Sequence, residues 1–302
     1  MEKTPKVTFG YVNCNRIFYL KSAVESLLHC TDDYPNKEVI VVDNASDEEE
    51  TKEYLDSLED RGHTVIRNNK RDPKNEFARG INTIIEKSSG DYICIMQGDS
   101  QFNVKGGWLH EYIKFYENNP NAGCVAFDAQ RTIRNKTGNY SPKLGDSFKF
   151  VFDYNRFPTS GAGRVMYNKK AIDILYPWST ENDRHEGGGD SESKARAKFT
   201  QYMSKTGEKF YCAMPIVPVM LGIYTDPCGA NARVTATGRI GDYWAPKKDF
   251  RYYEIHDYEQ VMTKFGSRDV PCGIEEMAIP IGFEAPIDEN GNWKKNPPKL
   301  NR

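Results

Sequence analysis

The chain has 302 residues, of which 38% are hydrophobic, and this is enough for the core of one large α/β domain or of two smaller ones. The formal net charge is −2 and the longest charge run, residues 47–50, is acidic, which argues against a protein that binds a nucleic-acid backbone. Seven cysteines are scattered without a C-x-x-C pair, which predicts reduced core thiols rather than a disulfide framework.

Over residues 1–130 the hydrophobic pattern predicts strands that alternate with helices. Strands are predicted at 6–12, 37–46, 63–69, at the start of 90–102, and at 124–129. Helices are predicted at 16–29, after an N-terminal cap at Ser46 and Asp47, at 77–85 and at 108–116. The alternation predicts right-handed crossovers, a mainly parallel sheet and a nucleotide-binding half.

Beyond residue 130 the regularity weakens, which predicts a mixed, substrate-binding half at 131–265 of the same domain. Residues 130–147 are rich in turn formers, and 163–168 have the pattern of a strand. A further apolar strand is expected before Leu221, and a helix is expected at 190–207 with Gly207 as its end. Prolines and weak periodicity predict an extended C-terminal arm over 266–302.

Three short segments follow predicted strands, at the edge where open parallel sheets bind their ligands. They are Val12-Asn13-Cys14-Asn15-Arg16, Asp43-Asn44-Ala45-Ser46 and Gln97-Gly98-Asp99-Ser100. The first lacks G-x-G-x-x-G, and the chain has no P-loop lysine motif, which argues against hydride transfer and P-loop ATP hydrolysis.

Two carboxylates in these segments are suited to different tasks. Asp43 can accept hydrogen bonds from a base or a ribose, and Asp99 can hold a hard divalent cation that bridges a diphosphate. Gly98 lets the backbone come close to a ligand. The alternative for each motif alone is ordinary turn and cap chemistry.

These segments resemble inverting glycosyltransferases of family 2, which have the GT-A fold. Residues 7–28 match the family's strand, Pro-Thr-Tyr-Asn-Arg and helix, with Val12 where proline is usual and Asn15-Arg16 retained. The resemblance implies that Asp43 contacts the nucleobase. It implies a nucleotide-sugar site that includes Val12, Asn13, Arg16, Asn44 and Gly98. Residues 75–82 are similar to rhamnosyltransferase-like members, which implies that Arg79 faces the nucleotide.

The stretch "DYICIMQGDSQF" is similar to the family's Asp-x-Asp segment. Gln97 stands at its first acidic position, so the resemblance leaves Asp99 as the ligand of Mn²⁺ or Mg²⁺, with phosphates and waters completing the shell. Asp226 falls near the place of the family's late metal-binding histidine and is a second candidate ligand, with Arg233 and Arg239 as possible diphosphate partners.

Residues 160–172 resemble the family segment between the donor and acceptor sites. In this resemblance Ser160, Gly161 and Arg164 are candidates to touch the donor sugar or diphosphate, and a tight turn before a strand is the alternative.

The catalytic base is expected in "HEGGGDSESKAR", residues 185–196, which resembles the family's Glu-Asp-x-Asp-Leu-x-x-Arg element. This alignment makes Asp190 the base that removes the proton from the acceptor hydroxyl. The alternative is that Asp190 only caps the following helix, in which case Glu186 or Glu192 is the base.

The resemblance implies sugar transfer from a nucleoside diphosphate sugar, such as a UDP- or dTDP-sugar, to a glycan or another hydroxyl acceptor. Two alternatives are a catalytically silent GT-A domain that binds a nucleotide sugar or glycan, and a nucleotidyltransferase, whose glycine-rich first loop is missing from "GYVNCNR". The sequence shows no signal-peptide layout and no run of about 18 apolar residues. We therefore expect a cytoplasmic protein, with peripheral membrane contact left open.

Overall fold

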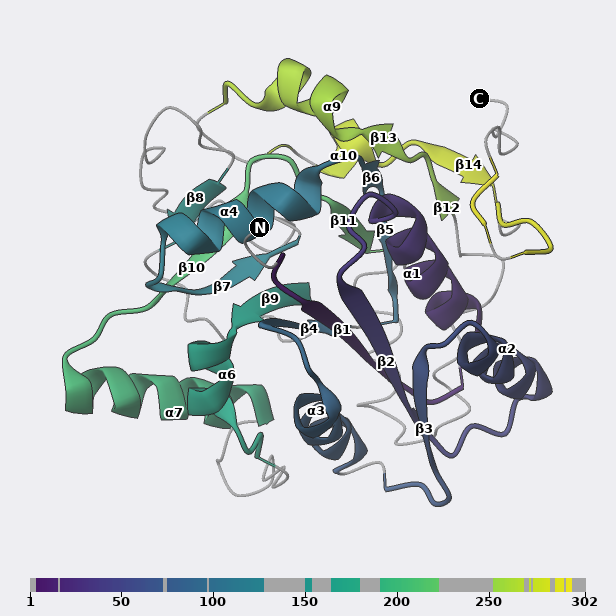
Figure 1. Ribbon diagram of the computed structural model, residues 1–302, viewed down its shortest axis with the longest axis horizontal. Coiled ribbons are helices and arrows are strands. Elements are labelled where there is room, and N and C mark those ends of the chain that lie inside the picture. Colours follow the sequence, from purple (N-terminus) through teal and green to yellow (C-terminus); the bar gives the residue numbers. More distant parts are fainter. Residues whose placement is uncertain are drawn as a thin grey trace.

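The structure is a computed structural model, and it places a central β-sheet between two layers of helices (Figure 1). It describes residues 4–15, 17–72, 75–96, 98–127, 150–153, 164–179, 191–222, 252–268, 272, 274–282, 286–290 and 292–294. All structural statements below concern these residues.

The first half of the chain forms four parallel strands with helical crossovers, as the sequence predicts. The elements are β1 (Val7–Asn13), α1 (Ile17–Cys30), β2 (Lys37–Asn44), α2 (Glu49–Asp60), β3 (Thr64–Asn68), α3 (Glu76–Lys87) and β4 (Tyr92–Met96). Almost every residue of β1 and the last six of β2 are buried, because central parallel strands are covered on both faces. The strands lie in the order β3-β2-β1-β4, so β1 is central.

The second half extends the same sheet with mixed directions. Its strands are β7 (Ala122–Ala126), β8 (Phe150–Asp153), β9 (Arg164–Asn168) and β10 (Tyr211–Pro215). They complete the order β3-β2-β1-β4-β9-β7-β10-β8, in which β9 runs antiparallel to both of its neighbours. The predicted α/β class, with a largely parallel sheet flanked by helices, is confirmed.

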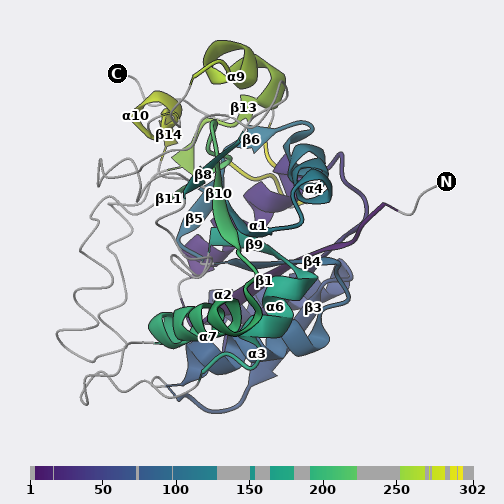
Figure 2. The ribbon, with the colours of Figure 1, turned by 90° about the vertical axis from the view of Figure 1, so that its left-hand side faces the viewer.

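Helices cover both faces of the sheet (Figures 1 and 2). One layer contains α1, α2 and α4 (Trp108–Asn118), and the Trp108 indole of α4 donates to the Cys30 carbonyl of α1 at 2.8 Å. The other layer contains α3, α6 (Lys169–Leu175) and α7 (Ser191–Thr206). Gly10 of β1 lets α3 pack closely, because a Cβ atom there would lie 2.2 Å from the Ile84 side chain.

The C-terminal residues pack beside α1 and the strand that follows Asp99. They form β12 (Tyr252–Tyr253), β13 (His256–Asp257), α9 (Tyr258–Phe265), α10 (Ile274–Met277) and β14 (Pro280–Gly282). The buried Gln101 amide donates to the Tyr253 carbonyl at 2.8 Å and accepts from the Tyr253 N–H at 2.9 Å. Tyr19 of α1 and Trp293 share a small apolar cluster, so this segment is joined to the core by apolar packing as well as by hydrogen bonds.

Several element boundaries differ from the prediction. The helix expected after Ser46 begins at Glu49, because Ser46 bonds back to Asp43 instead of capping it. The segment 90–102 divides into β4 and β5 (Ser100–Phe102), and β5 pairs with β11 (Met220–Gly222) outside the main sheet. The apolar run before Leu221 divides between β10 and β11. Residues 104–105 form β6, which pairs with β13.

Within the described residues, no helix has the length and apolar character that a bilayer span requires.

Candidate functional site

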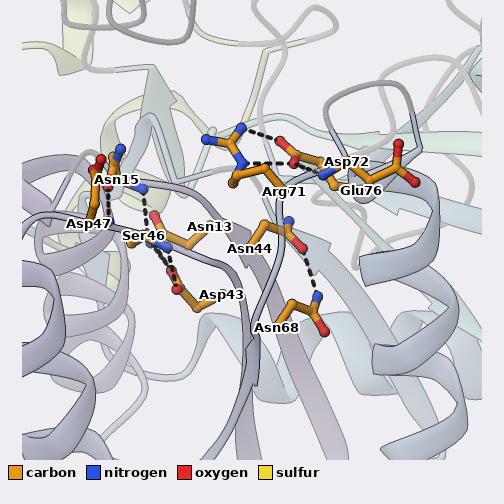
Figure 3. Close-up of polar contacts among 10 residues, drawn as sticks. All are labelled: Asn13, Asn15, Asp43, Asn44, Ser46, Asp47, Asn68, Arg71, Asp72 and Glu76. Atoms are coloured by element: carbon orange, nitrogen blue, oxygen red, sulfur yellow. Dashed lines mark hydrogen bonds and ion pairs between the residues drawn. The ribbon is translucent and has the colours of Figure 1, made fainter.

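The first polar cluster forms where β1 and β2 end side by side. Asn13 lies opposite Asp43 in the parallel register, and the Asn13 amide donates to Asp43 Oδ1 at 2.8 Å. The Ser46 hydroxyl donates to the same oxygen at 2.6 Å, and the Ser46 N–H donates to Oδ2 at 3.0 Å (Figure 3). Each carboxylate oxygen accepts about two hydrogen bonds. Among the described donors, Oδ2 therefore retains capacity for one more, although the Asp43 residue is only 4% exposed.

Asn15 ties the loop after β1 to the loop after β2. Its backbone N–H donates to the Ser46 hydroxyl at 2.6 Å, and its side-chain oxygen accepts from the backbone N–H groups of Asp47 and Glu48 (Figure 3). Asn15 and Ala45 both have positive φ angles, 54° and 51°. A left-handed backbone costs about 1–2 kcal/mol for an L-residue other than glycine. The shared hydrogen bonds of Ser46 and Asn15 offset this strain and hold the two loops together.

A second group of polar residues lies in the loop between β3 and α3 and in the first turn of α3. Arg71 donates two bonds to Glu76, at 2.9 and 2.7 Å, and Arg79 forms an ion pair with Asp72 at 2.7 Å. Figure 3 shows the Arg71 group above the strand ends, with the Asn44 and Asn68 side chains below it, joined at 2.8 Å. The loop therefore adds charged side chains beside the Asp43 cluster.

Val12 also lies at this edge, but its side chain makes an apolar contact with α3. Its side chain packs against α3, because a Cβ atom at Gly80 would lie 2.7 Å from the nearest Val12 methyl. Any contact of Val12 with a ligand would therefore use its backbone.

The third part of the site is Asp99, which follows β4 at the same edge. Its carboxylate forms an ion pair with Arg164, the first residue of β9, at 3.4 Å. Among the described residues, a Cβ atom at the neighbouring Gly98 would meet only the Leu20 backbone, at an ordinary 3.7 Å, so packing against these residues does not require glycine there. No three metal-binding side chains gather into a cluster in the described part of the chain.

The structure thus brings together some of the predicted residues at one sheet edge: Val12, Asn13, Asp43, Asn44, Gly98 and Asp99, with Arg79 on the adjoining helix. Other residues discussed for the site lie outside the described residues, namely Arg16, Gln97, Ser160, Gly161, Glu186, Asp190, Asp226, Arg233 and Arg239.

Sequence reasoning missed the linking role of Ser46 and Asn15 and the presence of Arg71 and Glu76. Ser46 and Asn15 stand within the motifs that were recognised, so their positions carried a signal. Arg71 belongs to no motif, and Glu76 stands in the segment 75–82 that was recognised for Arg79 alone, so only the fold reveals that the two residues pair near the edge.

Cys14 lies between these groups, and its thiol is expected to be unreactive at neutral pH. Burial raises the pKa of Cys14 to about 12; the nearby Arg71 lowers it, and Glu76, Asp43 and Asp47 raise it further. With this pKa, about one thiol in 10⁴ is ionised at pH 8, against about a quarter for a free cysteine. Alkylation by iodoacetamide, located by peptide mass spectrometry, should therefore accelerate about tenfold per pH unit between pH 8 and 11. A rate at pH 8 equal to that of glutathione would contradict this expectation.

Comparison with known proteins adds a family match. The family model described as "Glycosyl transferase family 2" matches residues 11–175, which is more than half of the chain and includes the Asp43 cluster, Asp99 and Arg164. Among curated proteins, the chain is 33% identical over 127 residues to the uncharacterised protein y4gI of Sinorhizobium fredii (strain NBRC 101917 / NGR234). That match covers 41% of this chain and 13% of the relative, so the chain spans only a small part of that protein's length.

Two solved structures are also similar. The mannosyltransferase PcManGT from Pyrobaculum calidifontis, in complex with GDP-Man and Mn²⁺, aligns with a TM-score of 0.49 and 16% identity over 78% of this chain and 62% of its own. Residues 1–349 of TarS from S. aureus align with a TM-score of 0.47 and 14% identity over 69% of this chain and 57% of that one.

Proposed function

Because the chain belongs to glycosyl transferase family 2, we propose that it transfers a sugar from a nucleoside diphosphate sugar to an acceptor hydroxyl, with inversion at the anomeric carbon. The observation that carries the proposal is the position of the Asp43 cluster and of Asp99 at one edge of the sheet, within the family-matched residues. The sugar is proposed to be a hexose or deoxyhexose. The acceptor is proposed to be a growing glycan in the cytoplasm, with peripheral membrane contact allowed.

Asp43 supports a donor whose base carries a ring N–H. The Asp43 oxygens accept hydrogen bonds from Asn13 and Ser46. Among the described residues one donor, the Ser46 N–H, bonds to Oδ2, so Oδ2 can accept one further hydrogen bond from a ligand. The N3–H of uracil or thymine is such a donor, so a UDP- or dTDP-sugar fits this carboxylate. Asn13, Asn44, Arg79 and the Val12 backbone are proposed to border the same position, and Arg16, Ser160 and Gly161 are proposed to complete the nucleotide-sugar site.

A divalent metal ion fits the chemistry of Asp99. The carboxylate is a hard oxygen ligand at the strand edge, and Mg²⁺ or Mn²⁺ commonly takes one or two carboxylates together with substrate phosphates and waters. Asp226 is proposed as a second ligand. When bound, the ion would stabilise the negative charge on the departing diphosphate.

The proposed chemistry also needs a base on the acceptor side. The acceptor oxygen attacks the anomeric carbon, the bond from that carbon to the diphosphate oxygen breaks, and the diphosphate leaves with the electron pair. Asp190, directly before α7, is proposed to take the hydroxyl proton. Attack from the face opposite the leaving group inverts the anomeric configuration.

A panel of nucleoside diphosphate sugars tests this function. Thermal unfolding and sugar release are measured for the wild type and for Asp99→Asn, with Mn²⁺, with Mg²⁺ or with EDTA. A donor at 100 times its Kd should stabilise the wild type by about 2.7 kcal/mol. The stabilisation with metal, and slow sugar release, should both be lost in Asp99→Asn. Asp56→Asn is the matched control, because Asp56 lies on α2 in an exposed pair with Arg67.

The outcomes distinguish an active glycosyltransferase from a catalytically silent binding domain. Stabilisation by a donor without any sugar release or transfer would favour the silent binding domain. A wild type that responds to no donor under any of the three conditions would contradict the proposed function.

A further inference from the structure

The two oxygens of the Asp43 carboxylate are bound unequally by the protein. Oδ1 accepts hydrogen bonds from the Asn13 amide at 2.8 Å and from the Ser46 hydroxyl at 2.6 Å (Figure 3). Oδ2 accepts one hydrogen bond from the described residues, from the Ser46 N–H at 3.0 Å. An ionised carboxylate offers about four acceptor positions, two on each oxygen. Both positions on Oδ1 are therefore filled, and one position on Oδ2 is open.

The directions of these hydrogen bonds are fixed by their neighbours. The Ser46 hydroxyl oxygen accepts from the backbone N–H of Asn15 at 2.6 Å, and a backbone N–H can only donate. The single hydroxyl hydrogen of Ser46 is therefore directed to Asp43. Asn13 must also present its NH₂ group, because its oxygen would place one acceptor against another. The residues Asn13 and Asp43 are only 7% and 4% exposed, so water cannot readily replace these donors.

This arrangement distinguishes the nucleobases by the donors on their Watson–Crick edges. Uracil and thymine carry one donor there, the N3–H, which needs the single open position on Oδ2. Guanine carries two donors side by side, N1–H and the amino group at C2, and a carboxylate satisfies them by offering one oxygen to each. Cytosine carries an acceptor at N3, which would face another acceptor. With Oδ1 filled, guanine would leave a donor unpaired at a buried position, which weakens binding by roughly tenfold or more.

We propose that Ser46 and Asn13 are specificity-determining positioning residues, which fill Oδ1 of Asp43 and so make the base site select uracil or thymine and reject guanine. This inference rests on the proposed function, in which Asp43 contacts the base. It goes beyond that contact because the choice of base is assigned to the two groups that bind the carboxylate from the protein side. The hydroxyl of Ser46 has this role without any contact with the nucleotide.

Calorimetry with three nucleoside diphosphates tests the role of Ser46. UDP, CDP and GDP share the ribose and the diphosphate, so the ratios of their Kd values report the base alone. The wild type, with Mn²⁺, should bind UDP roughly tenfold or more tightly than GDP or CDP. Ser46→Ala opens a position on Oδ1, so UDP should bind more weakly and GDP should not. The preference for UDP over GDP should therefore fall about fivefold or more.

Three further variants separate this effect from a general loss of structure. Ser46→Thr keeps the hydroxyl and should keep the wild-type preference. Asn13→Ala opens Oδ1 while the bond between Asn15 and Ser46 remains, so it tests the same idea if Ser46→Ala fails to fold. Ser88→Ala is the matched control, because the Ser88 hydroxyl donates to the Ile85 carbonyl at the C-terminal end of α3. Every Kd should be unchanged in Ser88→Ala.

A merely structural role for Ser46 and Asn13 would weaken UDP and GDP in parallel. An unchanged ratio of the two Kd values in each of the two alanine variants that folds would therefore overturn the inference. Equal affinities of the wild type for UDP and GDP would also overturn it, and the proposed sugar transfer would stand. A wild type that binds none of the three nucleotides would overturn the inference and the proposed function together.

Discussion

Replacing Asp190 with asparagine is expected to lower the rate of sugar transfer by about 10²- to 10⁴-fold, which is the usual contribution of a positioned general base. An amide cannot take the proton of the acceptor hydroxyl, so the chemical step should slow. The nucleotide half should be untouched, and the Kd for the nucleoside diphosphate should stay at the wild-type value. Initial rates of sugar transfer, or of sugar release to water, measure the first effect and calorimetry measures the second.

Asp173→Asn is the control for this variant, because Asp173 lies on α6 in an exposed pair with Lys169. Its transfer rate should match that of the wild type. The fallback bases are tested by Glu186→Gln and Glu192→Gln. A wild-type rate in Asp190→Asn, together with a large loss in one of these two, would move the base to that residue.

Replacing Arg61 with methionine is expected to lower the free energy of unfolding by about 3 kcal/mol, because it leaves a buried carboxylate without its counter-ion. Glu25 of α1 is 1% exposed, and it accepts two bonds from Arg61, at 2.9 and 2.5 Å. The Tyr54 hydroxyl of α2 donates to the same carboxylate at 2.7 Å and cannot replace the lost charge. Urea unfolding followed by circular dichroism measures the change.

Two further variants identify the cause of this destabilisation. Glu25→Leu/Arg61→Met removes both charges and should recover much of the lost stability, since an apolar pair of similar size can replace a buried ion pair. Arg67→Met removes an arginine that pairs with the exposed Asp56 and Glu59, and should cost less than about 1 kcal/mol. If Arg61→Met lowered the free energy of unfolding no more than Arg67→Met does, the stability of the protein would not depend on a counter-ion for Glu25.

The parallel half could be predicted because its strands are nearly continuous apolar runs. A central strand such as β2 is buried on both faces, so local sequence is enough to locate it. The strands of the second half depend on distant partners instead. Phe150–Asp153 pairs with β10 about 60 residues later, and no local pattern marks this pairing. Pro215 and Pro218 divide one apolar run into two strands, because proline lacks the N–H that a ladder requires.

The site could be predicted where a motif ends a strand, as at Asp43 and Asp99. The role of Ser46 could not, because serine before acidic residues is typical of a helix cap. The left-handed turn at Ala45 instead directs Ser46 back to Asp43. Arg164 was predicted only as a candidate to touch the donor sugar or diphosphate. Its contact with Asp99 depends on the antiparallel register of β9 against β4, which the sequence alone does not reveal.

The left-handed turns at Asn15 and Ala45 also bear on how the donor edge recognises its ligand. Fixing the backbone of one loop residue costs about 1–2 kcal/mol of conformational entropy. In this protein the loss occurs during folding, because the bonds of Asn15 and Ser46 already fix both loops. Nucleotide binding therefore does not have to order them. Relatives that share this edge are expected to change donor by replacing side chains on a fixed backbone, with the loop conformations retained.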